Sequence, residues 1–209
     1  QQDLQPLGEQ LGVYLGELKT LSATESLFRV MGEDQQDQVK TIMGEAAQLV
    51  VLLGIGASSL GTTAMAQALG LSHRLLVLDV VDPAQFAITK DRIKRAYIEN
   101  ASLKYIVVSR SGTTSETLEN FKQLIEFIKP LDPAWQKKVT VVTDENTPLW
   151  NSAEEQGFGR VASPGSISGR FSLFTSVAIV PLVALGADIN SFCDGGQKMA
   201  DACLGTTQV

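Results

Sequence analysis

The sequence predicts an α/β fold, a three-layer, doubly wound and mostly parallel five-stranded sheet with extra helices at its N-terminal end. Short runs of Val, Leu and Ile alternate with segments of helical periodicity, which is typical of βαβ units. The loops that follow the apolar runs carry the chemically distinctive residues: GIGASSLG, DVVDP, SRSGTTSET, TDENTP and SPGSISGR. The links that precede the runs, such as GLSHR and NASLK, carry no such cluster. In a parallel sheet the loops beyond the carboxyl ends of the strands bind the ligand. The chain has 209 residues, of which 44% are hydrophobic and 19% charged, and this suits an ordinary globular interior.

Residues 1–48 are predicted to form an N-terminal helical segment. Apolar residues recur at helical spacing from Leu4 through Leu11 and Tyr14 to Leu18. We expect this helix to pack across the main domain or against a partner. A short helical pattern follows over 24–31, and Asp34 is the expected N-cap of a third helix that runs to about Ala47.

Residues 49–190 are predicted to form the main domain, and 191–209 a C-terminal helix and the start of a link to a further domain. The expected strands begin at Leu49 and cover 75–80, 105–108, 139–143 and 160–162. One expected helix begins near Leu60, and a second covers 88–99. A third has Glu116 in its first turn and runs to about Lys129, and a fourth, buried helix covers 171–186. The dipeptide Asp82-Pro83 is read as a turn.

The loop after the third strand carries the most distinctive chemistry. Six hydroxyl residues fall within nine positions around Gly112, namely Ser109, Ser111, Thr113, Thr114, Ser115 and Thr117. A helix starts in this stretch, and the unpaired backbone N–H groups of a helix N-terminus favour an anion. The alternative is that the hydroxyls only cap and turn the chain. The number of hydroxyls favours a phosphate site.

The stretch GIGASSLG after the first strand allows two interpretations. Gly54 and Gly56 match the first glycines of a dinucleotide-binding loop, and Asp79 ends the next strand, where such sites have a ribose-binding acid. Ser59 stands where the third glycine belongs, which weakens that interpretation. Alternatively, Ser58 turns its hydroxyl toward the same phosphate as the central loop.

Arg170 precedes the long apolar run 171–186 and should therefore have an anionic partner. That partner is either a ligand or a carboxylate of the protein, and in the second case the arginine is purely structural. His73, the only histidine, is expected on the surface, away from the site. No Ser/His/Asp or Cys/His catalytic set can be assembled from this sequence.

Composition excludes several other classes. The formal charge of −6 and pI near 4.8 argue against nucleic acid as a partner. Two cysteines without a companion histidine suggest neither a zinc site nor a disulfide framework, and a cytoplasmic location is expected. No signal peptide is visible, and the apolar run 171–186, interrupted by Pro181, is too short to span a membrane.

Three strings resemble signatures of the glucose-6-phosphate isomerase (phosphoglucose isomerase) family. They are GIGASSLG, VVSRSGTTSET and SGRFSLFTSVAIVPLVALGADI, in the order of the family. The central string also resembles the wider sugar isomerase (SIS) phosphosugar-binding fold, whereas Gly-Arg-Phe-Ser before an apolar helix is particular to the isomerase. The resemblance covers about residues 49–201.

The resemblance implies an enzyme that interconverts glucose 6-phosphate and fructose 6-phosphate through an enediol in glycolysis and gluconeogenesis, without metal or cofactor. Ser58, Ser109, Ser111 and Thr114 would hold the 6-phosphate of the sugar. Arg170 would stabilise negative charge on the enediol. A homodimer of the complete protein is implied as well.

The sequence departs from the family pattern at several points. The family often has Lys where Arg110 stands and Gly where Ala57 stands. Its catalytic glutamate, histidine and lysine belong to a second SIS domain and have no counterpart in these 209 residues. We therefore expect the N-terminal part of a longer enzyme that is inactive alone. The alternative is a non-catalytic SIS module that senses a phosphosugar.

Overall fold

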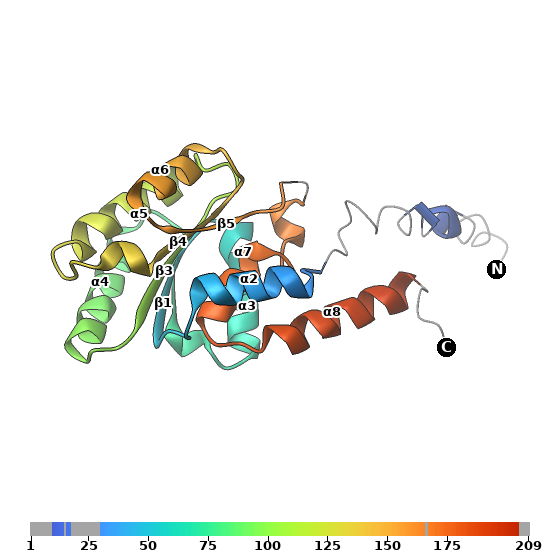
Figure 1. The fold of residues 1–209 in the computed structure, drawn as a ribbon, viewed down its shortest axis with the longest axis horizontal. Helices are drawn as coiled ribbons and strands as arrows, with labels where there is room; N and C mark the ends of the chain where they lie inside the picture. The colour runs from blue at the N-terminus through green and yellow to red at the C-terminus, as the bar shows by residue number, and fades with distance from the viewer. Residues whose placement is uncertain (1–9, 15, 18–29, 166, 205–209) are drawn as a thin grey trace.

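A single parallel sheet forms the centre of the computed structural model, which describes residues 10–14, 16–17, 30–165 and 167–204 (Figure 1). Five strands lie in the order β2-β1-β3-β4-β5, and every neighbouring pair is parallel. The strands are β1 (Leu49–Leu53), β2 (Leu75–Leu78), β3 (Leu103–Val108), β4 (Val139–Thr143) and β5 (Gly159–Ala162). The five strands of the sequence prediction are confirmed, with ends shifted by one or two residues.

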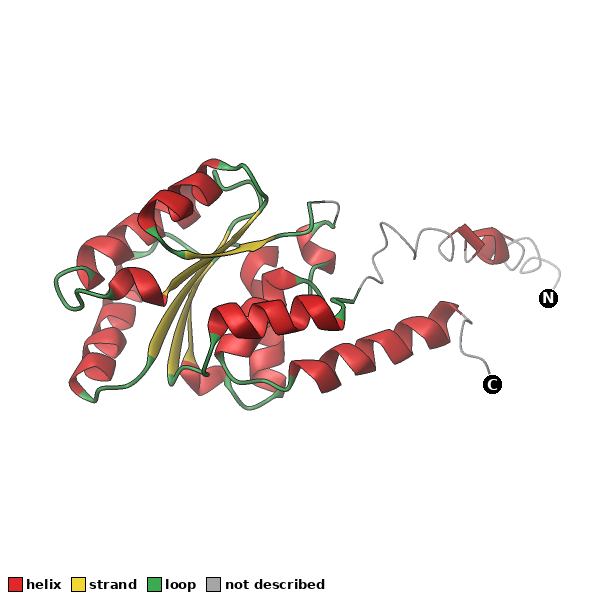
Figure 2. Cartoon of the chain, in the orientation of Figure 1, coloured by secondary structure: helices red, strands yellow, loops and turns green. Residues whose placement is uncertain are grey.

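Helices cover both faces of the sheet, which makes the three predicted layers (Figures 1 and 2). One face is covered by α2 (Glu33–Met43), α3 (Ala57–Ala68), α7 (Ser176–Ala184) and the start of α8 (Ile189–Leu204). The other is covered by α4 (Pro83–Ile98), α5 (Ser115–Ile128) and α6 (Pro148–Gln156). The described residues also form the short 3-10 turns η2 (Ser72–Arg74), η3 (Trp135–Lys138) and η4 (Gly169–Phe171).

The order of the strands creates a switch point between β1 and β3. The chain leaves β1 through α3 on one face of the sheet, and it leaves β3 through α5 on the opposite face. The loops after these adjacent strands therefore lead toward opposite faces of the sheet. Ligands of doubly wound sheets bind at such a point.

The core explains why the strands are apolar throughout. Val50 and Leu52 of β1 pack against one helical layer, while Val51 and Leu53 pack against the other, and all four are fully buried. Every residue of α7 is buried, as predicted for a helix that is apolar all round. It begins at Ser176, however, and not at Phe171. The Thr175 hydroxyl caps it by accepting a bond from the Val177 N–H, 3.4 Å.

Two other helices, in contrast, begin earlier than predicted. Helix α3 starts at Ala57, three residues before Leu60, because Gly56 adopts a positive φ of 57° and turns the chain directly into the helix. Helix α4 starts at Pro83, so Asp82-Pro83 is a helix start and not a turn. The Asp82 carboxylate accepts bonds from the N–H groups of Ala84 and Gln85.

Helix α6 is absent from the sequence prediction, although Thr147 caps it and Pro148 occupies its first turn. Helix α2 has Gly32 at its N-cap, so the prediction of Asp34 in that position is wrong. It ends at Met43, before Ala47, because Gly44 has a positive φ of 59°.

The N-terminal helical prediction is tested only in part. Residues 10–14 and 16–17 are helical, with Leu11 and Tyr14 about 60% exposed. The described residues therefore do not show the expected packing of this helix across the main domain. The other residues of its apolar stripe and most of the pattern 24–31 lie outside the described residues, and Met31 is not helical. Among the described helices, none has the length and apolarity needed to cross a membrane.

Candidate active site

The hydroxyl loop, residues 109–114, connects the end of β3 to the start of α5. Ser109 is buried, and its Oγ lies 3.0 Å from the Thr114 Oγ1. Ser111 is exposed and accepts bonds from the backbone N–H and the hydroxyl of Thr113, 3.3 and 3.1 Å. The structure thus brings together three of the candidate phosphate-binding residues on one tight loop.

Gly112 gives this loop its shape. Its φ of 63° belongs to the left-handed region, and a Cβ atom placed there would lie only 2.7 Å from the Cβ and Oγ1 of Thr147. The loop is therefore seated on the N-terminus of α6, and only glycine fits.

The N-cap side chain of α5 leaves the N–H groups of the first turn uncapped. Thr114 is the N-cap, but its side chain makes no capping bond, so its hydroxyl does not occupy the N–H groups of the first turn. The Thr117 hydroxyl in that turn is buried and has no partner among the described residues. Glu116 is exposed, and its pKa lies below the ordinary value because its own backbone N–H, and then the Ser115 hydroxyl, bond to its carboxylate.

Ser58 lies in the first turn of α3, after the glycine loop 54–56. Its side chain is half-buried, and its backbone N–H donates to the Ile55 carbonyl at 3.2 Å. A Cβ atom on Gly54 would lie 3.2 Å from the Val108 carbonyl oxygen, so the glycine loop runs close to the end of β3. Ser58 and the hydroxyl loop therefore flank the switch point from its two sides.

Arg170 lies in the turn η4, which packs against the start of α3. A Cβ atom on Gly169 would lie 2.9 Å from the Ala57 Cβ. Arg170 is exposed, and its guanidinium carbon lies 5.0 Å from the ring centre of Phe171. In the described part of the chain no carboxylate forms an ion pair with it. The interpretation of Arg170 as a purely structural arginine, paired with a carboxylate of the protein, therefore has no support among the described residues.

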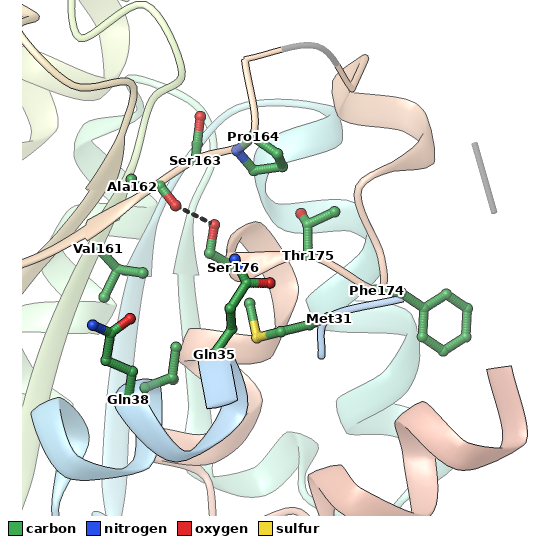
Figure 3. A pocket seen from close by; sticks show the side chains of 11 residues that line it. Met31, Gln35, Gln38, Val161, Ala162, Ser163, Pro164, Phe174, Thr175 and Ser176 are labelled. Atoms are coloured by element: carbon green, nitrogen blue, oxygen red, sulfur yellow. Dashed lines mark hydrogen bonds between the residues drawn. The ribbon is translucent and has the colours of Figure 1, made fainter. Parts of the chain in front are cut away.

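A cavity of about 220 Å³ lies apart from these residues (Figure 3). Its walls come from α2 and from the two ends of the β5–α7 connection, with Ser163 at one end and Thr175 at the other. The Ser176 hydroxyl donates to the Ala162 carbonyl at 2.7 Å across this region. None of the candidate residues lines this cavity, so it is not the predicted site.

The comparison with protein families shows which family this chain belongs to. The family model described as phosphoglucose isomerase matches residues 26–208. The chain belongs to the phosphoglucose isomerase family. The match includes all three loops on which the resemblance in the sequence rests.

Curated relatives of this family are named as glucose-6-phosphate isomerases. The probable enzyme of Haloarcula marismortui is 37% identical over 158 residues, which are 74% of this chain and 35% of that protein. The enzyme of Methanocaldococcus jannaschii is 31% identical over 175 residues, 83% of this chain and 41% of its own length. The chain thus spans well under half the length of these relatives.

Solved structures agree on the fold. A Thermus thermophilus protein described as hypothetical superimposes with a TM-score of 0.74 at 26% identity, over 97% of this chain and 50% of that one. A glucose-6-phosphate isomerase from Chlamydia trachomatis gives 0.66 at 23% identity, over 82% of this chain and 33% of that one. The predicted three-layer, doubly wound α/β fold is confirmed.

Five residues near the candidate loops were not assigned individually from the sequence: Arg110, Thr143, Asp144, Thr147 and Ser163. Arg110 belongs to the hydroxyl loop and was noted only as a departure from the family pattern. The other four belong to TDENTP and SPGSISGR, which were recognised as polar segments after strands. Thr143 Oγ1 lies 2.9 Å from Thr147 Oγ1, and Thr147 Oγ1 donates to the Asp144 carbonyl at 2.9 Å. A strand that ends in Thr-Asp before a Thr-Pro helix start was the available signal.

His73 lies on the surface, as the sequence predicted, and at the amino ends of the strands, opposite to the candidate site. It is exposed in η2, before β2, and its Nδ1 lies 3.0 Å from the Gly70 carbonyl oxygen. Asp79, the ribose acid of the dinucleotide interpretation, accepts a bond from the Gln85 amide at 3.4 Å. The candidate site built from the hydroxyl loop, Ser58 and Arg170 uses neither residue.

Proposed function

We propose that this chain provides the phosphate-binding loops and the charge-stabilising arginine of a glucose-6-phosphate isomerase. The observation that carries the proposal is the switch point between β1 and β3. The hydroxyl loop and Ser58 flank it, and the turn of Arg170 packs against the helix that carries Ser58. Relatives named as this isomerase support the substrate class, a hexose 6-phosphate.

The phosphate would be bound by neutral donors. The hydroxyls of Ser109, Ser111 and Thr114, with that of Ser58, can rotate toward the phosphate oxygens, and the N-terminus of α5 adds backbone N–H groups and a partial positive charge. Bonds to a charged acceptor are stronger than bonds between neutral groups. Such a site holds a phosphate dianion without a metal, and the proposal requires no cofactor.

Arg170 would act on the other end of the sugar. When a proton leaves C2 of the open-chain substrate, negative charge develops on the oxygens at C1 and C2, and a fixed guanidinium nearby lowers the energy of that state. The base that takes the proton, and the groups that open the ring, are proposed to lie in a second SIS domain. The chain alone would therefore bind the substrate without converting it.

Further parts of the proposal rest on likeness to the family. The complete protein would be a cytoplasmic homodimer, with neither nucleic acid nor a membrane as partner. A phosphosugar sensor without catalysis remains the competing function. The sensor would use the hydroxyl loop but has less use for an arginine without a carboxylate partner among the described residues.

The first test is the intact mass of the native protein in its source cells, compared with 22.4 kDa for this chain. A much larger protein that converts fructose 6-phosphate into glucose 6-phosphate supports the isomerase, and unphosphorylated fructose should not react. A native mass near 22.4 kDa, with binding but no conversion, would favour the sensor instead. Absence of hexose 6-phosphate binding would contradict both.

A further inference from the structure

We propose that Asp144 is a positioning residue that fixes the connection carrying Arg170 relative to the hydroxyl loop. Asp144 follows β4, and no candidate role was assigned to it from the sequence. Its contacts join the two halves of the candidate site. The expected effect of Asp144 on turnover rests on the proposed function. Its effect on the position of the Arg170 connection rests on the contacts alone.

The backbone of Asp144 is bound to the hydroxyl loop and to α6. Its N–H donates to the Arg110 carbonyl at 3.0 Å, and the Thr143 hydroxyl donates to the same carbonyl at 3.2 Å. Its own carbonyl accepts a bond from the Thr147 hydroxyl at 2.9 Å. Asp144 is therefore held on both sides, and the start of the hydroxyl loop is held with it.

The carboxylate of Asp144 is directed to the other connection, which leaves β5. Its Oδ1 accepts a hydrogen bond from the hydroxyl of Ser163, a buried residue. A Cβ atom on Gly165 would lie 3.2 Å from Oδ2, so the backbone of the connection passes directly over the carboxylate. A Cβ atom at position 165 would require this carboxylate or the backbone to shift by a few tenths of an ångström.

A second contact runs parallel to the first. The Arg110 guanidinium donates to the Ile167 carbonyl at 3.5 Å, three residues before Arg170. The hydroxyl loop and the Arg170 connection are thus joined at two points. Of the two contacts, the one between Asp144 and Ser163 is better shielded from solvent, because Ser163 is buried whereas Arg110 is exposed.

The chemistry of the joint explains why an acid stands here. Within the described chain Asp144 has no cationic partner, so its charge does not serve an ion pair. A carboxylate oxygen is a strong acceptor, and without it the buried Ser163 hydroxyl would lose its partner. The bond between Asp144 and Ser163 sets the distance between the hydroxyl loop and the Arg170 guanidinium. Displacements of about 1 Å in an active site can lower the rate by about 100-fold.

The test uses five variants of the complete protein: Asp144→Ala, Asp144→Asn, Ser163→Ala, the double variant Asp144→Ala/Ser163→Ala and, as the matched control, Glu145→Ala. Glu145 is the adjacent acid and is exposed. The assays are kcat and KM for fructose 6-phosphate, and hydrogen exchange of the backbone amides from Ile167 to Phe171 without substrate. Asparagine keeps an acceptor oxygen and should recover most of the loss.

We expect Asp144→Ala and Ser163→Ala each to lower kcat by about 10- to 100-fold, with KM changed by less than about threefold. The double variant should be no worse than either single one, since both remove the same bond. Exchange at residues 167–171 should accelerate in both, and remain unchanged in Asp144→Asn and Glu145→Ala. Should Asp144→Ala fail to fold, Ser163→Ala gives the same test.

Unchanged exchange at residues 167–171 in Asp144→Ala or Ser163→Ala would overturn the inference. A kcat loss that Asp144→Asn shares in full would overturn it too, because the acceptor oxygen would then be irrelevant. The exchange measurement needs no substrate. A complete protein that lacks isomerase activity but shows faster exchange would refute the proposed function and leave the positioning role intact.

Discussion

Gly169 lies in direct contact with Ala57, so closely that a Cβ atom on Gly169 would come within 2.9 Å of the Ala57 Cβ. Ala57 is the first residue of α3 and Gly169 the first of η4, and the two are separated by more than a hundred positions in the sequence. Through this contact the turn that carries Arg170 is placed beside the helix that carries Ser58.

The Gly169→Ala substitution should disturb the position of Arg170. Overpacking a close contact costs about 1 to 3 kcal/mol of stability, and the relief available here is a shift of the η4 turn. We expect turnover of the complete protein to fall at least about tenfold. The double variant Ala57→Gly/Gly169→Ala removes the clashing methyl group and should recover turnover. A double variant as slow as the single one would show that the contact does not place Arg170.

The Ser111→Ala substitution should weaken binding of hexose 6-phosphates. Loss of one bond to a charged group costs about 1 to 3 kcal/mol, or about 5- to 150-fold in Kd. Calorimetric titration of the complete protein with fructose 6-phosphate measures this. Ser115→Ala is the matched control, because the Ser115 hydroxyl donates to Glu116 at the exposed start of α5. Equal losses in both variants would refute a specific role of Ser111.

The sequence predicted the sheet well because apolar periodicity reports burial directly. β1, β3 and β4 are buried along almost their whole length, and each is a run of Val, Leu and Ile with few polar residues. The hydroxyl loop could also be recognised from the sequence, because so many Ser and Thr residues around one glycine are unusual in a loop that only turns the chain. These features are local, and a single sequence contains them in full.

The helix starts and the joints between loops could not be predicted in the same way. The start of α3 depends on the positive φ of Gly56, and α4 starts at a proline that looks like a turn in isolation. The contacts of Asp144 with Ser163 and of Gly169 with Ala57 join distant segments, so they depend on the tertiary arrangement. Hydrophobic periodicity in the sequence does not predict contacts between such distant segments.

Acid should destabilise the domain through Asp132, far from the candidate site. Burial raises its pKa, but bonds from Lys138 at 2.6 Å, the Ala134 N–H at 2.8 Å and Tyr97 outweigh burial, so the pKa lies below its ordinary value. A carboxyl with a lower pKa in the folded state stabilises the fold above its unfolded pKa of about 3.9 and loses this contribution as the pH falls through the folded pKa.

Asp132→Asn should therefore lower the free energy of unfolding near pH 7 and flatten its decline below about pH 4. Urea unfolding of the wild type and the variant, between about pH 7 and pH 3, measures both effects. Asp37→Asn is the control, because that carboxylate pairs with Lys40 at an exposed site and should contribute little. Parallel curves for wild type and Asp132→Asn would contradict the assignment.

Arg170→Ala should separate catalysis from stability more clearly than any other substitution. Arg170 is exposed and has no carboxylate partner in the described part of the chain, so its removal should change Tm by no more than about 2 °C. Turnover of the complete protein should fall by about 100-fold or more, as on loss of a group that stabilises developing charge, while KM changes little. Arg160→Ala removes the same charge from a guanidinium paired with Glu154 at 2.8 Å and should leave turnover unchanged. If Arg170→Ala instead lowered Tm strongly and KM and kcat only slightly, the arginine would be structural, and the phosphosugar sensor would become the better description of this domain.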